Sequence, residues 1–345
     1  MVLGGSGYVA GELLRLLVDH PGLEVSSVVS ESQAETPVRA VFPQLQNRLG
    51  DLCFSSREQA LTRLESGPMA LFSAAPHGAS AGLVAECLER AGQAGTQMRV
   101  VDASADFRFA SAADYAAVYG HPHPAPALLD QFASAVPEHL AATDRMHIGH
   151  PGCFATALLM ATVPLISLGL IEGDLHAVGI TGSTGSGRSL GATTHHPERH
   201  ANLFAYKALA HRHAPEVMNI CEALTGTRPA LRFIPHSGPF ARGIHLTVQA
   251  RLKTPSHADD LRAALASFYA GKPFVVMRDE PPRIKDVIGS NYCHLGVATD
   301  SESAAVFVVL DNLVKGAAGG SIQWMNRLLG LPEVTGLESP ALAWA

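Results

Sequence analysis

The sequence predicts an α/β protein with two domains: a doubly wound parallel sheet, then an α+β domain built on a mixed sheet. Three observations support this prediction. A glycine-rich turn joins a short apolar strand to a helix at the start of the chain, and further apolar strands alternate with helices up to about residue 149. Longer strands of alternating polarity follow from about residue 170. A chain of 345 residues, 47% of them hydrophobic, is long enough to bury two cores.

The charge balance argues against large polyanionic partners. The formal net charge is −6 and lysine and arginine form no long clusters, so a nucleic acid or an anionic membrane finds no basic surface. The apolar run from Ala157 to Leu170 is too short to span a bilayer and is interrupted by Pro164. We therefore expect a cytoplasmic protein with a small-molecule ligand, and no nucleic-acid or membrane partner.

Cysteine and histidine usage argues against disulfides and bound metal. The five cysteines are scattered and never form a C-x-x-C pair, which fits a reducing compartment. The 17 histidines cluster at 121–124, 194–200 and 211–213. None of these clusters has the H-E-x-x-H spacing, or acidic and cysteine partners at recurring ligand spacings. We expect no metal site.

The stretch "MVLGGSGYVAGELLRLL" reads as a strand, a turn and an amphipathic helix, and "LEVSSVVSES" follows as a second strand. Gly4, Gly7 and Ala10 have the spacing G-x-x-G-x-x-A, which lets backbone N–H groups approach a pyrophosphate at the helix N-terminus. Only three residues precede Gly4, so the first strand is short. The pattern is that of a Rossmann-type nucleotide-binding unit.

The end of the second strand bears on the choice of nucleotide. An Asp or Glu there holds the ribose hydroxyls of NAD, and this chain has Ser30, Glu31 and Ser32. Glu31 favours NAD, whereas the flanking hydroxyls suit a 2′-phosphate. The residues by themselves leave both cofactors open.

Polar residues follow the next two predicted strands. The segments 69–75 and 98–104 are apolar and are separated by a helical run, so they continue the parallel sheet. The first ends in "PHG" and the second in "SADFR", which contains Arg108. Doubly wound sheets bind ligands at the carboxyl ends of their strands, and we expect a binding cleft there.

The pattern changes in the second half of the chain. Alternating strands are predicted within 175–187, 230–238, 243–252 and 304–313. They indicate a mixed sheet that serves substrate binding and subunit contact, so we expect a homo-oligomer, a dimer or a tetramer. A helix from residue 312 is predicted to pack back onto the first domain. The domains are then 1–149, completed by 312–345, and 150–311.

One cysteine has an unusual setting. In "HPGCFATA", Cys153 follows a Pro-Gly turn and precedes an apolar run long enough to be a helix. A helix N-terminus favours an anion, so Cys153 is a candidate nucleophile. The competing interpretation is a small buried hydrophobic residue. A thiol beside a nucleotide domain favours a thioester route, in which the thiolate attacks an activated acyl group before hydride reduction.

That chemistry needs a base, and "AHRHAPEV" offers His211 and His213, with Glu216 as a possible orienting carboxylate. We expect only one of these two histidines to act as the base for the thiol, and the sequence leaves open which.

Anion ligands are also needed. The glycine-rich stretch 181–189, which contains Ser183 and Gly185, is a candidate nest of N–H groups for a phosphate. Arg108 and Arg242 suit bidentate binding of an anion.

Several long stretches, in the same order, carry a resemblance that spans nearly the whole chain. They are "GGSGYVAGELLRLL", "PHG", "VDASADFRF", "HPGCFATA", "GSTGSGR", "AYKALAHRHAPEV", "GSNYCHLG" and "DNLVKGAAGG". With them the sequence resembles the N-acetyl-γ-glutamyl-phosphate reductases of arginine biosynthesis, within the semialdehyde dehydrogenase superfamily. The resemblance implies a cytoplasmic oxidoreductase that uses NADPH to reduce a small acyl phosphate.

The resemblance also implies site residues. Cys153 is the nucleophile and a histidine of the pair His211 and His213 is the base. We assign NADP binding to Gly4, Ser6, Gly7, Tyr8, Val9, Ser30, Ser32, Gly185 and Asn312, and substrate binding to Arg108, Ser183 and Arg242.

Some residues depart from the family's pattern, and further functions stay open. His150 and Phe154 stand where the family often has Asn and Tyr, and Glu31 stands where a basic residue would help to hold a 2′-phosphate. The stretch "THHPER" is similar to the sister reductase of lysine biosynthesis, which acts on a carrier-linked aminoadipyl phosphate. The activity of an aspartate-semialdehyde dehydrogenase, of a Cys/His hydrolase or of a nucleotide-sensing module also stays open.

Overall fold

The structure is a computed structural model that describes residues 1–343, and it divides into two compact units. The first unit comprises Met1–Ala135, Ala142–Pro151 and Ala317–Glu338. The second unit comprises Val136–Ala141, Gly152–Gly316 and the residues from Ser339. Residues 136–141, 312–316 and those from 339, which we expected in the first domain, thus belong to the second unit. Buried contacts hold them there, such as the ion pair between Lys315 and Glu138.

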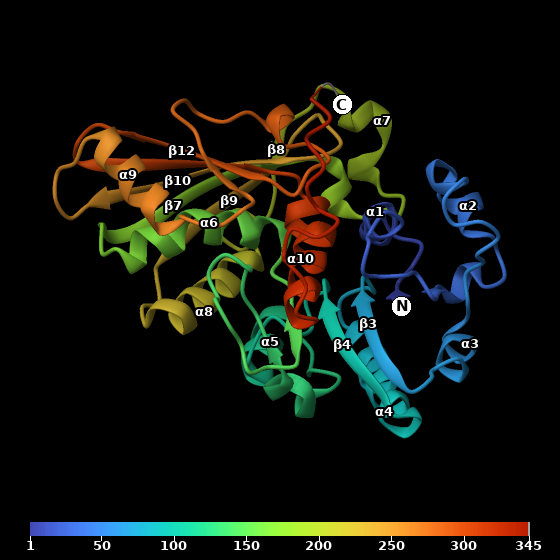
Figure 1. Cartoon of the computed structure of the whole chain (residues 1–345). Coiled ribbons are helices and arrows are strands. Elements are labelled where there is room, and N and C mark those ends of the chain that lie inside the picture. Colours follow the sequence, from blue (N-terminus) through green and yellow to red (C-terminus); the bar gives the residue numbers. More distant parts are fainter. Residues whose placement is uncertain (344–345) are drawn as a thin grey trace. The chain divides into compact units, whose positions relative to one another are not determined.

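The first unit is built on a six-stranded sheet in the order β2-β1-β3-β4-β6-β5, and every neighbouring pair is parallel. The prediction of a doubly wound parallel sheet is therefore confirmed. Figure 1 shows β3 and β4, the longest of these strands, side by side with α4 against them. The strands are β1 (Val2–Leu3), β2 (Val28–Val29), β3 (Gly67–Ser73), β4 (Thr96–Asp102), β5 (Phe132–Ala133) and β6 (His147–Gly149).

The second strand is much shorter than the predicted segment 23–32. The reason is its partner: β2 forms its ladder with β1, which consists of Val2 and Leu3 alone. The strands β5 and β6 were not predicted, because so short a segment has no readable alternation.

Helices of the first unit cover the sheet. Its C-terminal helix packs against α1 and β4, and buried Trp324 donates a hydrogen bond to the Ala135 carbonyl at 2.8 Å. This helix belongs to the first unit, and a π-turn precedes it (Val314–Ala318). The helices are α1 (Tyr8–Leu17), α2 (Val38–Val41), α3 (Arg57–Thr62), α4 (Ser80–Ala94), α5 (Ala112–Tyr119) and α10 (Gly319–Leu328).

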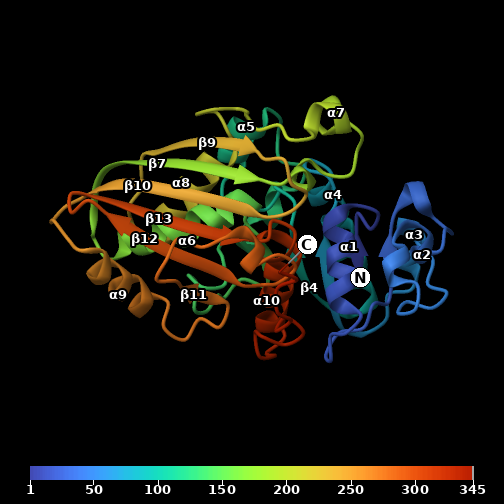
Figure 2. The same ribbon diagram turned by 90° about the horizontal axis from the view of Figure 1, so that it is seen from above.

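The second unit contains a seven-stranded mixed sheet in the order β11-β12-β13-β10-β7-β9-β8, which Figure 2 shows from above. The central strand β10 is antiparallel to both β13 and β7, whereas β7 and β9 are parallel. The predicted mixed sheet is confirmed, and β11 and β12 extend it. The strands are β7 (Ile171–Thr181), β8 (Phe204–Ala205), β9 (Leu231–Ser237), β10 (Ile244–Leu252), β11 (Val275–Met277), β12 (Cys293–Thr299) and β13 (Ser303–Leu310).

The helix α6 (Cys153–Ser167) forms the centre of the second unit's core. It packs against β7, β10 and β13 and against α8 (His213–Thr225) and α9 (Ala258–Phe268), and nearly all its side chains are buried. A helix that is apolar on every side is stable only when it is covered all round. Over the described residues, the structure has no helix whose length and hydropathy would let it cross a membrane. The short helix α7 (His196–Arg199) precedes β8.

Candidate active site

Cys153 is the first residue of α6, as predicted. The N-cap Gly152 is extended (φ −62°, ψ 158°) and has no side chain that could cap the helix. The carboxylate of Glu216, which is fully buried on α8, accepts the Gly152 N–H at 2.7 Å. The predicted orienting carboxylate thus contacts the backbone immediately before the nucleophile, which fixes the start of the cysteine's helix.

A glycine far along the chain presses against the thiol-bearing residue. A Cβ atom added to Gly316 would lie 2.8 Å from the Cys153 Cβ and 3.1 Å from its Cα. Real Cβ atoms do not approach so closely, so only glycine allows this packing. Gly316 lies in the π-turn and donates its N–H to the Asp311 carbonyl at 3.0 Å.

A buried ion pair anchors the same π-turn. Lys315 Nζ lies 2.6 Å from Glu138 Oε1, and the two side chains are 0% and 1% exposed. The ammonium also lies 5.8 Å from the centre of the Phe274 ring. Loss of either partner would leave a buried charge uncompensated, so this pair fixes the position of the turn that carries Gly316.

The two predicted histidines lie together. Their ring centres are 4.6 Å apart, and both side chains are buried. The ring of Phe154, which follows the cysteine, lies edge-on to both, at 6.1 Å from His211 and 6.5 Å from His213. The structure therefore brings the HRH pair to the first turn of the cysteine's helix.

The two histidines differ in chemistry. Burial above all, with the charges of Arg212 and Lys207, lowers the pKa of His211 to about 4, so the ring is neutral at pH 7. Its Nδ1 accepts the backbone N–H of His213 at 3.3 Å. In the tautomer that this bond selects, the ring proton lies on Nε2, where His211 can donate to an oxygen.

Tyr206 joins this cluster and was not predicted from the sequence. Burial raises the pKa of its phenol above the usual value, and the charge of neighbouring Cys153 adds to the effect. Its ring lies edge-on to His211 at 5.5 Å. The only signal in the sequence was an aromatic residue five positions before the HRH pair.

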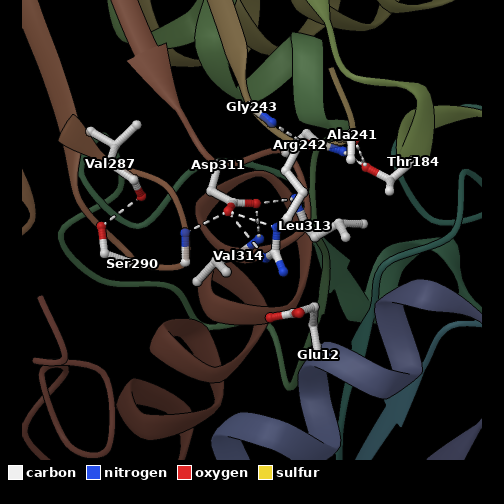
Figure 3. Close-up of polar contacts among 12 residues, drawn as sticks. Glu12, Thr184, Ala241, Arg242, Gly243, Val287, Ser290, Asp311, Leu313 and Val314 are labelled. Carbon is white, nitrogen blue, oxygen red and sulfur yellow. Dashed lines mark hydrogen bonds and ion pairs between the residues drawn. The ribbon is translucent and has the colours of Figure 1, made fainter. Parts of the chain in front are cut away.

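Arg242 is held by a buried carboxylate (Figure 3). Its Nε donates to Asp311 Oδ2 at 3.1 Å, and this carboxylate also accepts the N–H groups of Gly289 and Leu313. Asp311 is fully buried, whereas 23% of the Arg242 side chain is exposed. The carboxylate therefore orients a guanidinium that remains accessible. Asp311, like Tyr206, was not predicted from the sequence.

Asn312 ties the glycine-rich stretch to the same place. Its Oδ1 accepts the Gly243 N–H at 2.7 Å and its Nδ2 donates to Thr184 Oγ1 at 3.0 Å. The predicted residues Ser183, Gly185, Arg242 and Asn312 therefore lie in one cluster of the second unit.

Three N–H groups of the predicted nest are already paired within the protein. Ser183 and Thr184 donate their N–H groups to the carbonyls of Phe240 and Ala241, and Gly185 donates to Gly182. These N–H groups are used in hydrogen bonds within the protein, because the backbone groups of a tightly packed turn must be paired. A phosphate contact through another group of the stretch, such as the Ser183 hydroxyl, stays a prediction.

The glycine turn of the first unit fits a pyrophosphate. Gly4 has φ +68°, and an added Cβ would lie 2.5 Å from the Ala74 carbonyl oxygen. Gly7 is the N-cap of α1, and an added Cβ there would meet only the Gly4 oxygen, at 3.7 Å. A side chain at Gly7 would fill a space that lies open before the N–H groups of the first turn. Ser6, Tyr8 and Val9 flank Gly7 in the sequence, and their predicted contact with the nucleotide stays a prediction.

Hydroxyl groups gather after β2. Ser30 Oγ lies 3.4 Å from both Ser6 Oγ and Ser32 Oγ. Glu31 Oε1 accepts the N–H of Arg57 at 2.8 Å, at the start of α3. The carboxylate that would favour a ribose diol is thus bonded to the protein's own backbone.

Arg108 lies inward. It is 5% exposed, and it donates through Nε to the His150 carbonyl and through one terminal nitrogen to the Ala103 carbonyl, both at 2.9 Å. It therefore braces the segments that follow β4 and β6. Its expected contact with substrate stays a prediction.

Comparisons with known proteins follow the same division. Residues 1–132 match the family model described as "Semialdehyde dehydrogenase, NAD binding domain", and residues 153–312 match "Semialdehyde dehydrogenase, dimerisation domain". A nicotinamide cofactor is thus the one that the first unit's family binds. The crystal structure of aspartate semialdehyde dehydrogenase II from Vibrio cholerae has a TM-score of 0.69 at 16% identity, and covers 95% of this chain and 97% of its own. It shows the same fold.

Sequence relatives are closer. The N-acetyl-gamma-glutamyl-phosphate reductase of Pseudomonas aeruginosa (strain UCBPP-PA14) is 38% identical, over 99% of this chain and 98% of its own length. The protein of the same name from Dehalococcoides mccartyi (strain CBDB1) is 37% identical, over 99% of this chain and 97% of its own length. The chain therefore belongs to the semialdehyde dehydrogenase family and, within it, to the group of the N-acetyl-gamma-glutamyl-phosphate reductases.

Proposed function

We propose that this protein uses NADPH to reduce N-acetyl-γ-glutamyl phosphate to N-acetylglutamate 5-semialdehyde, with release of phosphate, in arginine biosynthesis. One observation carries the proposal: Cys153 begins a buried helix beside a histidine pair, in a chain 38% identical over nearly its full length to reductases of that name. The stretch "THHPER" favours an aminoadipyl phosphate, but it covers six residues, whereas the similarity to the N-acetyl-gamma-glutamyl-phosphate reductases covers nearly the whole chain.

The residues of the second unit provide the acyl-transfer half of the reaction. The Cys153 thiolate attacks the acyl carbon, a C–S bond forms, and the C–O bond to phosphate breaks to leave a thioester. His213 accepts the thiol proton, and His211 donates from Nε2 to the oxygen that gains negative charge. Arg242, oriented by Asp311, binds the leaving phosphate. A bound nicotinamide supplies the hydride that turns the thioester into the aldehyde and restores the thiol.

NADPH is the proposed cofactor. The hydroxyls of Ser6, Ser30 and Ser32 form a cluster that suits a 2′-phosphate, and the backbone N–H of Arg57 holds the Glu31 carboxylate. The open space before α1 suits the pyrophosphate. Gly185 and Asn312 are proposed to contact the nicotinamide end.

We also propose that the protein is a cytoplasmic homo-oligomer, a dimer or a tetramer, that acts on a free small molecule. The match of its second unit to a dimerisation domain supports the oligomer. The net charge of −6 supports the small substrate, since an acidic carrier protein would be repelled.

The reverse reaction tests the function. Purified protein is given N-acetylglutamate 5-semialdehyde, phosphate and NADP, and the absorbance of the reduced cofactor is followed. We expect reduction that depends on phosphate and changes little with salt. A large advantage for the carrier-linked aminoadipate analogue under the same conditions would contradict the assignment, and no change in absorbance would contradict the reaction class.

A further inference from the structure

Arg199, at the end of α7, is a buried cation of the second unit with no evident partner. Arg199 is 8% exposed. Within the described residues, its Nε and both terminal nitrogens have no hydrogen-bond acceptor. By contrast, buried Lys315 is paired with Glu138, and the partly exposed Arg242 is paired with Asp311. Because an arginine stays protonated and a buried unpaired charge is costly, the position indicates an anionic ligand.

Two aromatic residues, Phe204 and Tyr206, connect Arg199 to the nucleophile Cys153. Its guanidinium carbon lies 5.8 Å from the centre of the Phe204 ring. Phe204 pairs with Ser237 in β8, and the ladder continues where the Tyr206 N–H donates to the Pro235 carbonyl.

Residues two apart in an extended segment share a face, so Phe204 and Tyr206 project to the same side. Tyr206 in turn is the neighbour whose pKa responds to Cys153. Arg199 is thus separated from Cys153 by two aromatic residues on one face.

We propose that Arg199 binds the α-carboxylate of the substrate, an inference that rests on the proposed function. In the acyl phosphate, the phosphate is attached to the carbon that Cys153 attacks, whereas the α-carboxylate lies at the opposite end of the glutamyl chain. Arg199 is separated from the thiol by Phe204 and Tyr206. It is therefore placed to bind the distant α-carboxylate and not the phosphate. Its planar fork matches a carboxylate bidentately, and the Phe204 ring lies within cation–π distance of the guanidinium.

This contact is tested by measuring two proteins on two substrates, so that the effect of the mutation can be compared with the effect of removing the carboxylate. The reverse reaction is measured for the natural protein and for Arg199→Met, with N-acetylglutamate 5-semialdehyde and with its α-carboxamide analogue. If Arg199 holds the carboxylate, the natural protein loses about 100-fold in kcat/KM on the amide, the usual effect of removing one partner of a buried charge pair. The variant should treat the two substrates alike, within about threefold, with its KM for phosphate unchanged.

Two further measurements separate recognition from a structural role. N-acetyl-L-glutamate, which carries the α-carboxylate, should raise the melting temperature of the natural protein but not that of Arg199→Met. Added methylguanidine should restore part of the variant's activity toward the carboxylate substrate alone. Arg251→Met is the matched control, because Arg251 is exposed and paired with Glu172 near the end of the central strand β10, and it should match the natural protein in every assay.

The outcomes distinguish the two proposals. A variant that still prefers the carboxylate substrate by about 100-fold, or whose KM for phosphate rises instead, overturns the role of Arg199. If Arg199→Met does not fold, Arg199→Lys keeps the charge and loses the fork, and undiminished discrimination in that variant also overturns it. Failure of the natural protein to act on the semialdehyde contradicts the proposed function, irrespective of Arg199.

Discussion

The helices α1 and α6 begin in the same way and are surrounded differently. Each follows a glycine N-cap in an extended conformation, Gly7 with ψ 169° and Gly152 with ψ 158°, and neither glycine offers a capping side chain. At α1 the space in front of the N-cap is open. At α6 a carboxylate from α8 accepts the N-cap N–H, and Gly316 packs against the first residue, Cys153.

The open and the filled surroundings of these two helix N-termini suit two different functions, ligand binding and the positioning of a nucleophile. An open helix N-terminus offers N–H groups to a ligand that arrives with its own charge, as the start of α1 would to a pyrophosphate. A helix N-terminus that carries a nucleophile must hold one side chain in one place, so its surroundings are filled by the protein. Substitutions at the two helix starts and around them test this difference, from the largest expected effect to the smallest.

Removing the nucleophile should have the largest effect. Cys153→Ala should lower turnover by about 10⁴-fold or more, because no other group forms the thioester. NADPH binding, measured by fluorescence titration, should be nearly unchanged, since the proposed nucleotide residues of α1 are untouched. Cys153→Ser should be almost as inactive, because a hydroxyl lacks the acidity of a thiol. Substantial activity in the alanine variant would exclude the thioester route.

The histidine pair should show the next effect. His213→Asn should slow the chemical step by about 10² to 10⁴-fold, the range for a general base, and His211→Asn should act mainly on the oxygen it stabilises. Single-turnover rates measure both. If the thiol is alkylated by iodoacetamide at the natural rate in His213→Asn but slowly in His211→Asn, the two roles are reversed.

Acid should destabilise the protein through its buried histidines. Burial lowers the pKa of His139 to about 3, and those of His147 and His211 to about 4. The unfolded chain takes up these protons near pH 6.5 and the folded chain does not. The free energy of unfolding should therefore fall as the pH drops from about 6.5 to about 4. Urea denaturation at several pH values measures this, and a flat profile would contradict the burial.

Crowding the start of α6 should have a smaller effect. Gly316→Ala places a methyl group against Cys153, and we expect kcat per titrated thiol to fall about 10 to 100-fold, the effect of a misplaced nucleophile. Gly82→Ala is the matched control, because an added Cβ in α4 has nothing within 4 Å. Unchanged kcat per thiol in Gly316→Ala would show that the contact has no influence on the reaction.

The smallest effect is expected at the nucleotide unit. Glu31→Arg should increase the preference for NADPH over NADH about tenfold, the equivalent of one charge-assisted hydrogen bond to a 2′-phosphate. Glu58→Arg, on the nearby α3, controls for the change in net charge. Equal kcat/KM with the two cofactors in the natural protein would overturn the choice of NADPH.

Local signals made part of the site predictable. The glycine turn and the start of the helix at Cys153 depend on residues within a few positions of one another, and both lie where the sequence indicated. The nest within 181–189 was predicted from glycine content alone, and several of its N–H groups are paired within the protein. Whether a backbone N–H is free depends on what packs against it, here the segment 240–243.

The sequence by itself determined the fold class and the helix that begins at Cys153. Backbone preference and apolar periodicity act over one or two turns of chain, so they can be read directly. Only the tertiary structure decided what surrounds these elements: Glu216 reaches Gly152 over 64 positions, and Lys315 reaches Glu138 over 177. Such contacts depend on how whole helices and sheets pack, and no local pattern encodes the partner of a buried charge.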